Sequence, residues 1–155
     1  MVVKSFKGLI ADGGQDTIVL HTNNGSTGYR IVKFDIFPHK PGTQQSESTV
    51  QIFKIEQPEP VSTSTATVDF ADNTLLAAGF YGKSAGVDNA ETKIIHFDNE
   101  IFNQDIFVTH TETAGSQAVN YYIELEQIKL NLNENTVATL KDIRNIDQEF
   151  DTTIN

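Results

Sequence analysis

The chain of 155 residues contains no cysteine, no tryptophan and only one methionine. The absence of cysteine excludes disulfide bonds, thiolate zinc sites and cysteine nucleophiles. Basic residues are also scarce, since 11 Lys and Arg stand against 21 Asp and Glu, and the formal net charge is −10. Nucleic acid is not an expected partner, because binding to phosphates requires clustered cations.

Long apolar runs are missing as well. No segment approaches the roughly 18 uninterrupted apolar residues of a membrane-spanning helix, so we expect no membrane association. The first ten residues contain two lysines but no apolar stretch of about seven residues or more, and no small-residue cleavage site follows them. We therefore expect no export signal.

Uncharged polar residues dominate what is present. Thr, Asn, Gln and Ser account for 46 of the 155 residues, whereas charged residues make up only 21%. This composition suits the solvent-exposed face of β-strands, where Thr is favoured and long helix-forming side chains gain little. The length fits one domain with a real hydrophobic core.

Short apolar runs recur between turn signals along most of the chain. The clearest alternation lies in 119–130, where Tyr121, Ile123 and Leu125 occupy one face. In 29–37 the even positions, including Val32, are expected to share a face. We expect strands at 4–10, 16–22, 29–37, 48–57, 67–70, 92–97, 101–111 and 119–130, and either a strand or a helical turn at 73–81.

Two of the turn signals predict β-hairpins. The sequence Asn23-Asn24-Gly25-Ser26 offers the left-handed residues that a type I′ turn requires, and 114–117 is a second candidate. Eight or nine strands of this kind predict an all-β fold, namely an antiparallel β-sandwich of the jelly-roll type over residues 1–134.

The C-terminal segment, residues 135–155, has a different pattern. Apolar residues three apart predict a short helix with Asn135 as its N-cap, and a strand over 135–143 is the competing interpretation. The last residues are polar with isolated apolar positions, which is typical of an arm that becomes ordered against another subunit. The candidate interface residues are Ile143, Ile146, Phe150 and Ile154.

No local motif for a metal ion or a nucleophile stands out. The four histidines have no metal-binding spacing, and we expect His96 and His110 to lie at the surface or at a strand edge. Asp12 and Asp16 are weak candidates for calcium, because two carboxylates could approach a cation from one turn, but a tight turn uses the same residue types. The same caution applies to Asp69, Asp72 and Asn73.

Glu124 and Glu126 share one face of the strand expected at 119–130, within roughly 7 Å of each other. Such a pair can hydrolyse glycosides, but the alternation that pairs them also places them opposite the apolar face, where solvent is the expected neighbour. The sequences around Ser84 and Ser116 are expected to be turns. We therefore expect no catalytic residue, no cofactor and no enzymatic activity.

Several segments resemble small virion structural proteins of marine tailed bacteriophages. They are Gly28-Tyr-Arg-Ile-Val-Lys-Phe-Asp-Ile-Phe-Pro38, Val50-Gln-Ile-Phe-Lys54, Asp98-Asn-Glu-Ile-Phe-Asn-Gln-Asp-Ile106, Val119-Asn-Tyr-Tyr-Ile-Glu-Leu-Glu126 and Thr139-Leu-Lys-Asp-Ile-Arg-Asn145. The resemblance implies a jelly roll or related sandwich on the particle surface, as a capsid decoration or cement protein. It also implies a homo-oligomer, expected to be a trimer, that contacts the major capsid protein or other virion proteins and is assembled in the host cytoplasm.

Three other functions stay open at this point. A tail or fibre component is the nearest alternative. A lectin-like module could hold a sugar, with or without calcium, in the loops at 12–16 or 82–91. An enzyme of the cupin or glycosidase type would need a metal ion or the pair Glu124 and Glu126 in a cleft.

Overall fold

The computed structural model describes residues 1–41, 45–58, 67–84 and 89–131. This part of the chain forms eight strands and no helix, so it contains no helix that could cross a membrane. The strands are β1 (Val2–Ile10), β2 (Gln15–Ile18), β3 (Thr27–Pro38), β4 (Ser46–Phe53), β5 (Leu75–Lys83), β6 (Glu91–His96), β7 (Ile106–Glu112) and β8 (Val119–Lys129).

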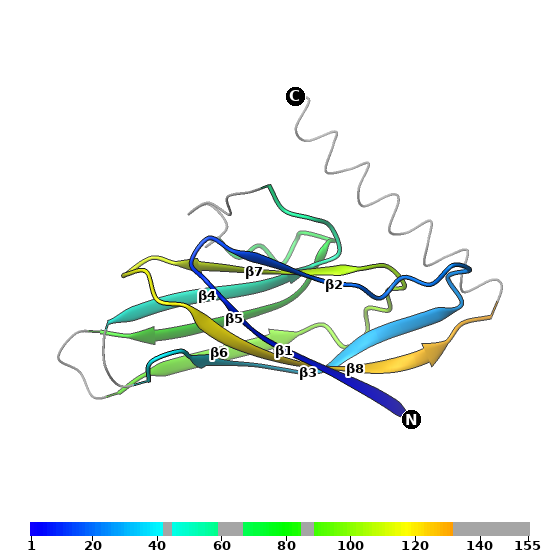
Figure 1. The fold of residues 1–155 in the computed structure, drawn as a ribbon, viewed down its shortest axis with the longest axis horizontal. Helices are drawn as coiled ribbons and strands as arrows, with labels where there is room; N and C mark the ends of the chain where they lie inside the picture. The colour runs from blue at the N-terminus through cyan, green and yellow to red at the C-terminus, as the bar shows by residue number, and fades with distance from the viewer. Residues whose placement is uncertain (42–44, 59–66, 85–88, 132–155) are drawn as a thin grey trace.

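The strands form two packed antiparallel sheets, which confirms the predicted β-sandwich (Figure 1). One sheet has the order β1-β8-β3 and the other the order β2-β7-β4-β5-β6. The pairings β1 with β8, β2 with β7 and β4 with β5 are the nested pairings of a jelly roll. The fourth nested pairing, β3 with β6, is altered. β6 contacts β3 but is hydrogen-bonded to β5.

Both predicted hairpins are wrong, because each turn carries the chain from one sheet to the other. The turn at 23–26 joins β2 to β3, and the turn at 114–117 joins β7 to β8. Gly25 has φ 65° and its N–H donates to Thr22 O at 3.3 Å, but no described residue other than glycine has a positive φ. A type I′ turn needs two such residues, so this turn is of another type.

A β-bulge explains why the expected face of β3 is only partly correct. The register against β8 shifts between Ile31 and Lys33, which leaves Val32 without a partner. Phe34 and Ile36 are buried as expected, but Ile31 replaces Val32 on the inner face. A single inserted residue reverses the alternation, and the apolar pattern of the sequence does not reveal it.

The core fills the space between the sheets. Its largest fully buried side chains come from both sheets and from Phe102, just before β7. Gly79 of β5 lies against β3, and a Cβ at this position would be 3.2 Å from the ring of Phe34 and 3.4 Å from Ile36. Glycine therefore allows the two sheets to approach closely here.

The remaining strand predictions have mixed outcomes. Residues 73–81 contribute the interior strand β5, and the central strand β4 is buried on both faces as expected. Residues 67–70 are not a strand, and β7 begins only at Ile106, because Phe102 forms an isolated bridge with Tyr29. The predictions for 135–155 lie outside the described residues.

Candidate binding surface

The outer face of the β1-β8-β3 sheet carries the most distinctive arrangement of exposed side chains. Since Tyr121, Ile123 and Leu125 point into the core, the alternate residues of β8 face outward. The register places one residue of β1 and one of β3 beside four of them. The four rows across β1, β8 and β3 are Leu9–Asn120–Phe37, Lys7–Tyr122–Asp35, Ser5–Glu124–Lys33 and Val3–Glu126–Arg30.

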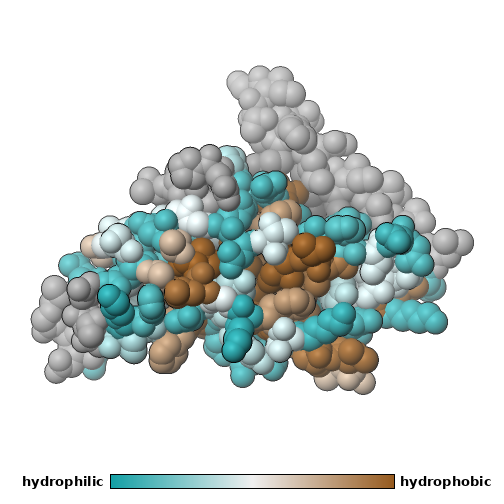
Figure 2. All heavy atoms as spheres, in the orientation of Figure 1, coloured by the Kyte–Doolittle hydropathy of each residue, from teal (hydrophilic) through white to brown (hydrophobic). Residues whose placement is uncertain are grey.

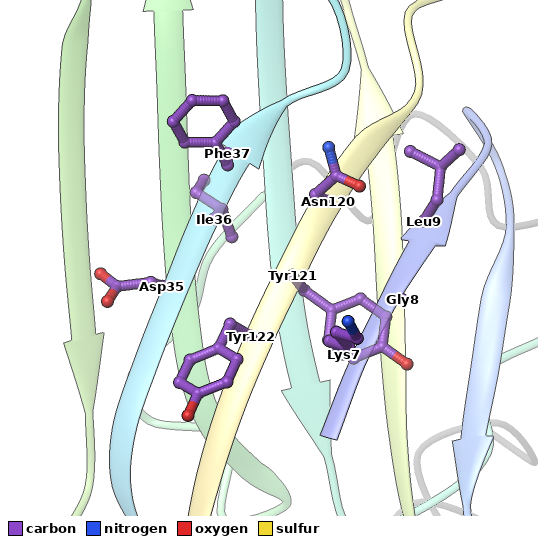
Figure 3. A pocket seen from close by; sticks show the side chains of 9 residues that line it. All are labelled: Lys7, Gly8, Leu9, Asp35, Ile36, Phe37, Asn120, Tyr121 and Tyr122. Carbon is purple, nitrogen blue, oxygen red and sulfur yellow. The ribbon is translucent and has the colours of Figure 1, made fainter. Parts of the chain in front are cut away.

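A groove of about 780 Å³ occupies two of these rows (Figure 3). Figure 3 shows Leu9, Asn120 and Phe37 side by side on three neighbouring strands, with Tyr122 in the next row. Leu9 is 48% exposed and Phe37 is 62% exposed, so two large apolar side chains stand in solvent on either side of a short amide. This volume lies in the range of about 300–1,000 Å³ that is usual for ligand sites.

Below the groove, the outer face is held by polar contacts. Arg30 Nε donates to Glu126 Oε2 at 2.5 Å. The Tyr122 hydroxyl donates to Glu124 at 2.8 Å, which raises the pKa of Tyr122. The ammonium group of Lys33 lies 5.7 Å from the centre of the Tyr122 ring, within the range of a cation–π contact.

Glu124 and Glu126 therefore lie on one face, as expected, but each has its own polar partner. Glu126 is paired with Arg30, and Glu124 accepts from the Tyr122 hydroxyl. The groove lies beside Tyr122 and does not include them.

The edge of β1 is a second feature of this sheet. β1 pairs with β8 over nine residues, and no described strand pairs with its other edge. Its N-terminal end projects from the sandwich at the lower right of Figure 1. Val2 and Val3 are accordingly 58% and 42% exposed. On the face shown in Figure 2, apolar side chains gather in separate patches among hydrophilic ones.

His110 corrects the expectation that it lies at the surface or at a strand edge. It is fully buried on β7, which lies between β2 and β4. Its Nδ1 lies 3.1 Å from Ile10 O, whereas its buried Nε2 has no hydrogen-bond partner among the described residues. Burial lowers the pKa of His110. The neighbouring Thr109, Thr111 and Glu112 resemble a solvent-exposed strand in sequence, but all three are buried.

The other histidines do not come together. His96 ends the edge strand β6, in agreement with the prediction of a strand edge. His21 is exposed, and its ring lies 2.7 Å from Asp105. Burial acts to raise the pKa of Asp105, but hydrogen bonds from His21 and from the Leu20 N–H outweigh it, so the pKa lies below its usual value.

The candidate calcium residues make separate structural contacts. Asp12 accepts the Glu112 N–H at 2.9 Å, and Asp16 accepts the Tyr121 hydroxyl at 3.0 Å. Asp69 and Asp72 accept backbone N–H groups of their own turns. Within the described ranges, no group of three or more His, Asp or Glu side chains is arranged to hold a metal ion. The interface candidates Ile143, Ile146, Phe150 and Ile154 lie outside these ranges.

Glu112 is the buried group that the sequence analysis missed. Its carboxylate accepts four hydrogen bonds, from the N–H groups of Glu47 and Ala114 and from the hydroxyls of Ser46 and Ser48. Burial acts to raise the pKa of Glu112, but these hydrogen bonds together hold it below its usual value. The partners lie more than sixty positions earlier in the chain, except for Ala114, so no local pattern indicates this site.

Comparison with known proteins identifies no family for this chain. No family model and no curated protein matches it. Among solved structures, a chain of the Bacillus endospore appendages, described as a novel family of disulfide-linked pili, is similar with a TM-score of 0.36 and 10% identity. The similarity covers 83% of this chain and 89% of that chain. The present chain has no cysteine and cannot form disulfide links.

Proposed function

We propose that the protein is a non-enzymatic structural protein that assembles through protein–protein contacts. More specifically, we propose a capsid decoration or cement protein of a tailed bacteriophage head, in line with the resemblance of its segments to virion proteins. The observation that carries the proposal is the free edge of β1, nine residues long, with exposed valines at its projecting end.

An edge of this kind is suited to assembly. Unpaired N–H and C=O groups along a long, regular edge strand are a template for pairing with another chain. β1 contains Lys4 and Lys7 and no acidic residue, whereas the whole chain carries −10. The edge already carries positive charge, so further lysines would oppose its burial against another chain.

The contribution of the edge to assembly can be tested with the double variant Val2→Lys, Val3→Lys. Both side chains are exposed, so the fold should survive, but the added charges oppose burial of the edge. We expect a trimer or larger ring for the wild type by light scattering and a smaller species for the double variant. Val19→Lys is the matched control, because Val19 is 67% exposed and lies outside the strands. Equal masses for all three proteins would contradict a role of the edge.

The location in the virion is tested by immuno-electron microscopy. Antibodies against the purified protein should label the heads of particles from the phage that encodes it. Label confined to the tail would favour the tail or fibre alternative. Intact particles that carry no label, with the protein present in the infected cell, would contradict the virion role.

A further inference from the structure

We propose that the groove between Leu9 and Phe37 is a binding site for a neutral carbohydrate. This function goes beyond assembly, because the groove uses outward-facing side chains, whereas strand addition would use the backbone edge of β1; the two sites share only the β1 residues Lys7, Gly8 and Leu9. It also differs from a sugar site in the loops, since every side chain of the groove stands on a paired strand.

The walls of the groove are apolar and far enough apart for a ring. Leu9 and Phe37 flank Asn120 on the two neighbouring strands, and adjacent strands are about 4.8 Å apart, so the walls are about 10 Å apart. The asparagine is too short to fill the space between them. A sugar ring has an apolar C–H face that can lie against the exposed Phe37 ring, as aromatic side chains commonly provide in binding sites.

Asn120 on the floor of the groove, with Lys7 and Asp35 in the next row, can form hydrogen bonds with a ligand. Neither the Asn120 amide nor the Lys7 ammonium group makes a hydrogen bond to another residue in the described part of the chain. Within the described ranges, Asp35 has only a long ion-pair contact with Lys33, 3.9 Å between Oδ2 and Nζ. Together these groups present donors and acceptors, which matches the hydroxyl groups of a sugar.

The charges of the groove favour a neutral ligand. Lys7 and Asp35 lie on opposite sides of Tyr122 in one row, so the groove has one charge of each sign. An anionic or cationic ligand would be attracted by one of them and repelled by the other, whereas hydroxyl groups can accept from Lys7 and donate to Asp35.

The backbone beneath the groove excludes one competing mode of binding. β8 is the central strand of its sheet and is paired on both sides along its length. An extended peptide therefore cannot add to it as a further strand. Recognition in the groove must come from side chains, as it does for sugars.

The test uses an array of neutral hexasaccharides of glucose, galactose, mannose and N-acetylglucosamine, together with sialylated and sulfated glycans, all in the presence of EDTA. We expect the wild type to bind a neutral member and titration calorimetry to confirm it. Asn120→Ala and Phe37→Ala should each weaken this binding at least tenfold without lowering Tm, because neither side chain is buried or bonded in the core. Ile95→Ala, at an exposed position on β6 of the other sheet, should bind as the wild type does.

Three results would overturn the carbohydrate site: no binding to any neutral glycan, binding to acidic glycans alone, or neutral binding that both groove variants retain. The mass of each variant in solution distinguishes failure of the carbohydrate site from failure of the assembly proposal. Groove variants that lose sugar binding but keep the oligomer would support both proposals. For the edge variant we expect the reverse, a lost oligomer with sugar binding retained.

Discussion

The buried carboxylate of Glu112 gives the sharpest test of the described structure. Glu112→Ala removes the acceptor of four hydrogen bonds that join the end of β7 to the start of β4. The hydroxyls of Ser46 and Ser48 can rotate toward other acceptors, but the N–H groups of Glu47 and Ala114 are fixed by the backbone. A hydrogen bond to a charged group contributes about 1.5 kcal/mol or more, so the two fixed donors alone give a loss of about 3 kcal/mol.

For a chain of this size, a loss of about 3 kcal/mol lowers Tm by about 6–12 °C. Differential scanning calorimetry at pH 7 measures it directly. Glu47→Ala is the matched control, because the Glu47 side chain is exposed and, among the described residues, accepts only from the Thr113 hydroxyl, at 2.7 Å. We expect a change of about 0.5 kcal/mol or less for this control. Equal losses for the two variants would refute the role of Glu112.

The pH dependence of the same site has a definite sign. The pKa of Glu112 is lower in the folded protein than its ordinary value of 4.5, because its hydrogen bonds outweigh burial, so the folded state favours the ionised form. The resulting stability is present in full above the unfolded pKa and is lost as the pH falls through the folded pKa. The stability advantage of the wild type over Glu112→Gln should therefore shrink below pH 4.5, and an advantage that grows in acid would contradict this account.

Three further predictions concern other parts of the chain. Because burial lowers the pKa of His110 from 6.5, the neutral ring stabilises the fold above pH 6.5. The stability difference between wild type and His110→Gln, measured by urea titration, should therefore decrease as the pH falls from 7 to 5. An unchanged difference would count against the buried site. Gly25→Val should lower the free energy of unfolding by about 1 kcal/mol or more, because φ is 65° there. Gly115→Val is its control, since a Cβ at Gly115 meets only Gln45 O at 3.7 Å, and equal losses would mean that the backbone at 25 is not the cause. Truncation after Asn135 should reduce oligomer mass and particle binding if the C-terminal segment contributes to assembly, and unchanged assembly would remove that hypothesis.

The fold class was predictable because the apolar period survives in most strands. The alternation in β8 and the double-sided burial of β4 follow from the sequence, and both are confirmed. The connections were not predictable in the same way. A turn signal such as the one at 23–26 shows that the chain reverses, but the sequence does not show whether the next strand joins the same sheet or crosses to the other.

The candidate surface was less predictable than the fold. Leu9 and Phe37 are twenty-eight positions apart, and only the pairing of β1 and β3 with β8 brings both beside Asn120. The expected inward face of the even positions in 29–37 already turns Phe37 outward, but no local pattern shows which residues of β1 and β8 lie beside it. Glu112 and His110 were hidden for a related reason, since polar residues on a central strand resemble those on an exposed one until the neighbouring strands are known.

The proposal of an assembling structural protein is tested most directly by the mass of the purified protein in solution, measured by light scattering with and without EDTA. The account predicts a discrete trimer or larger ring whose mass does not change when EDTA is added. A monomer at every concentration, with a Tm that falls on chelation, would contradict it and would favour a metal-dependent binding module.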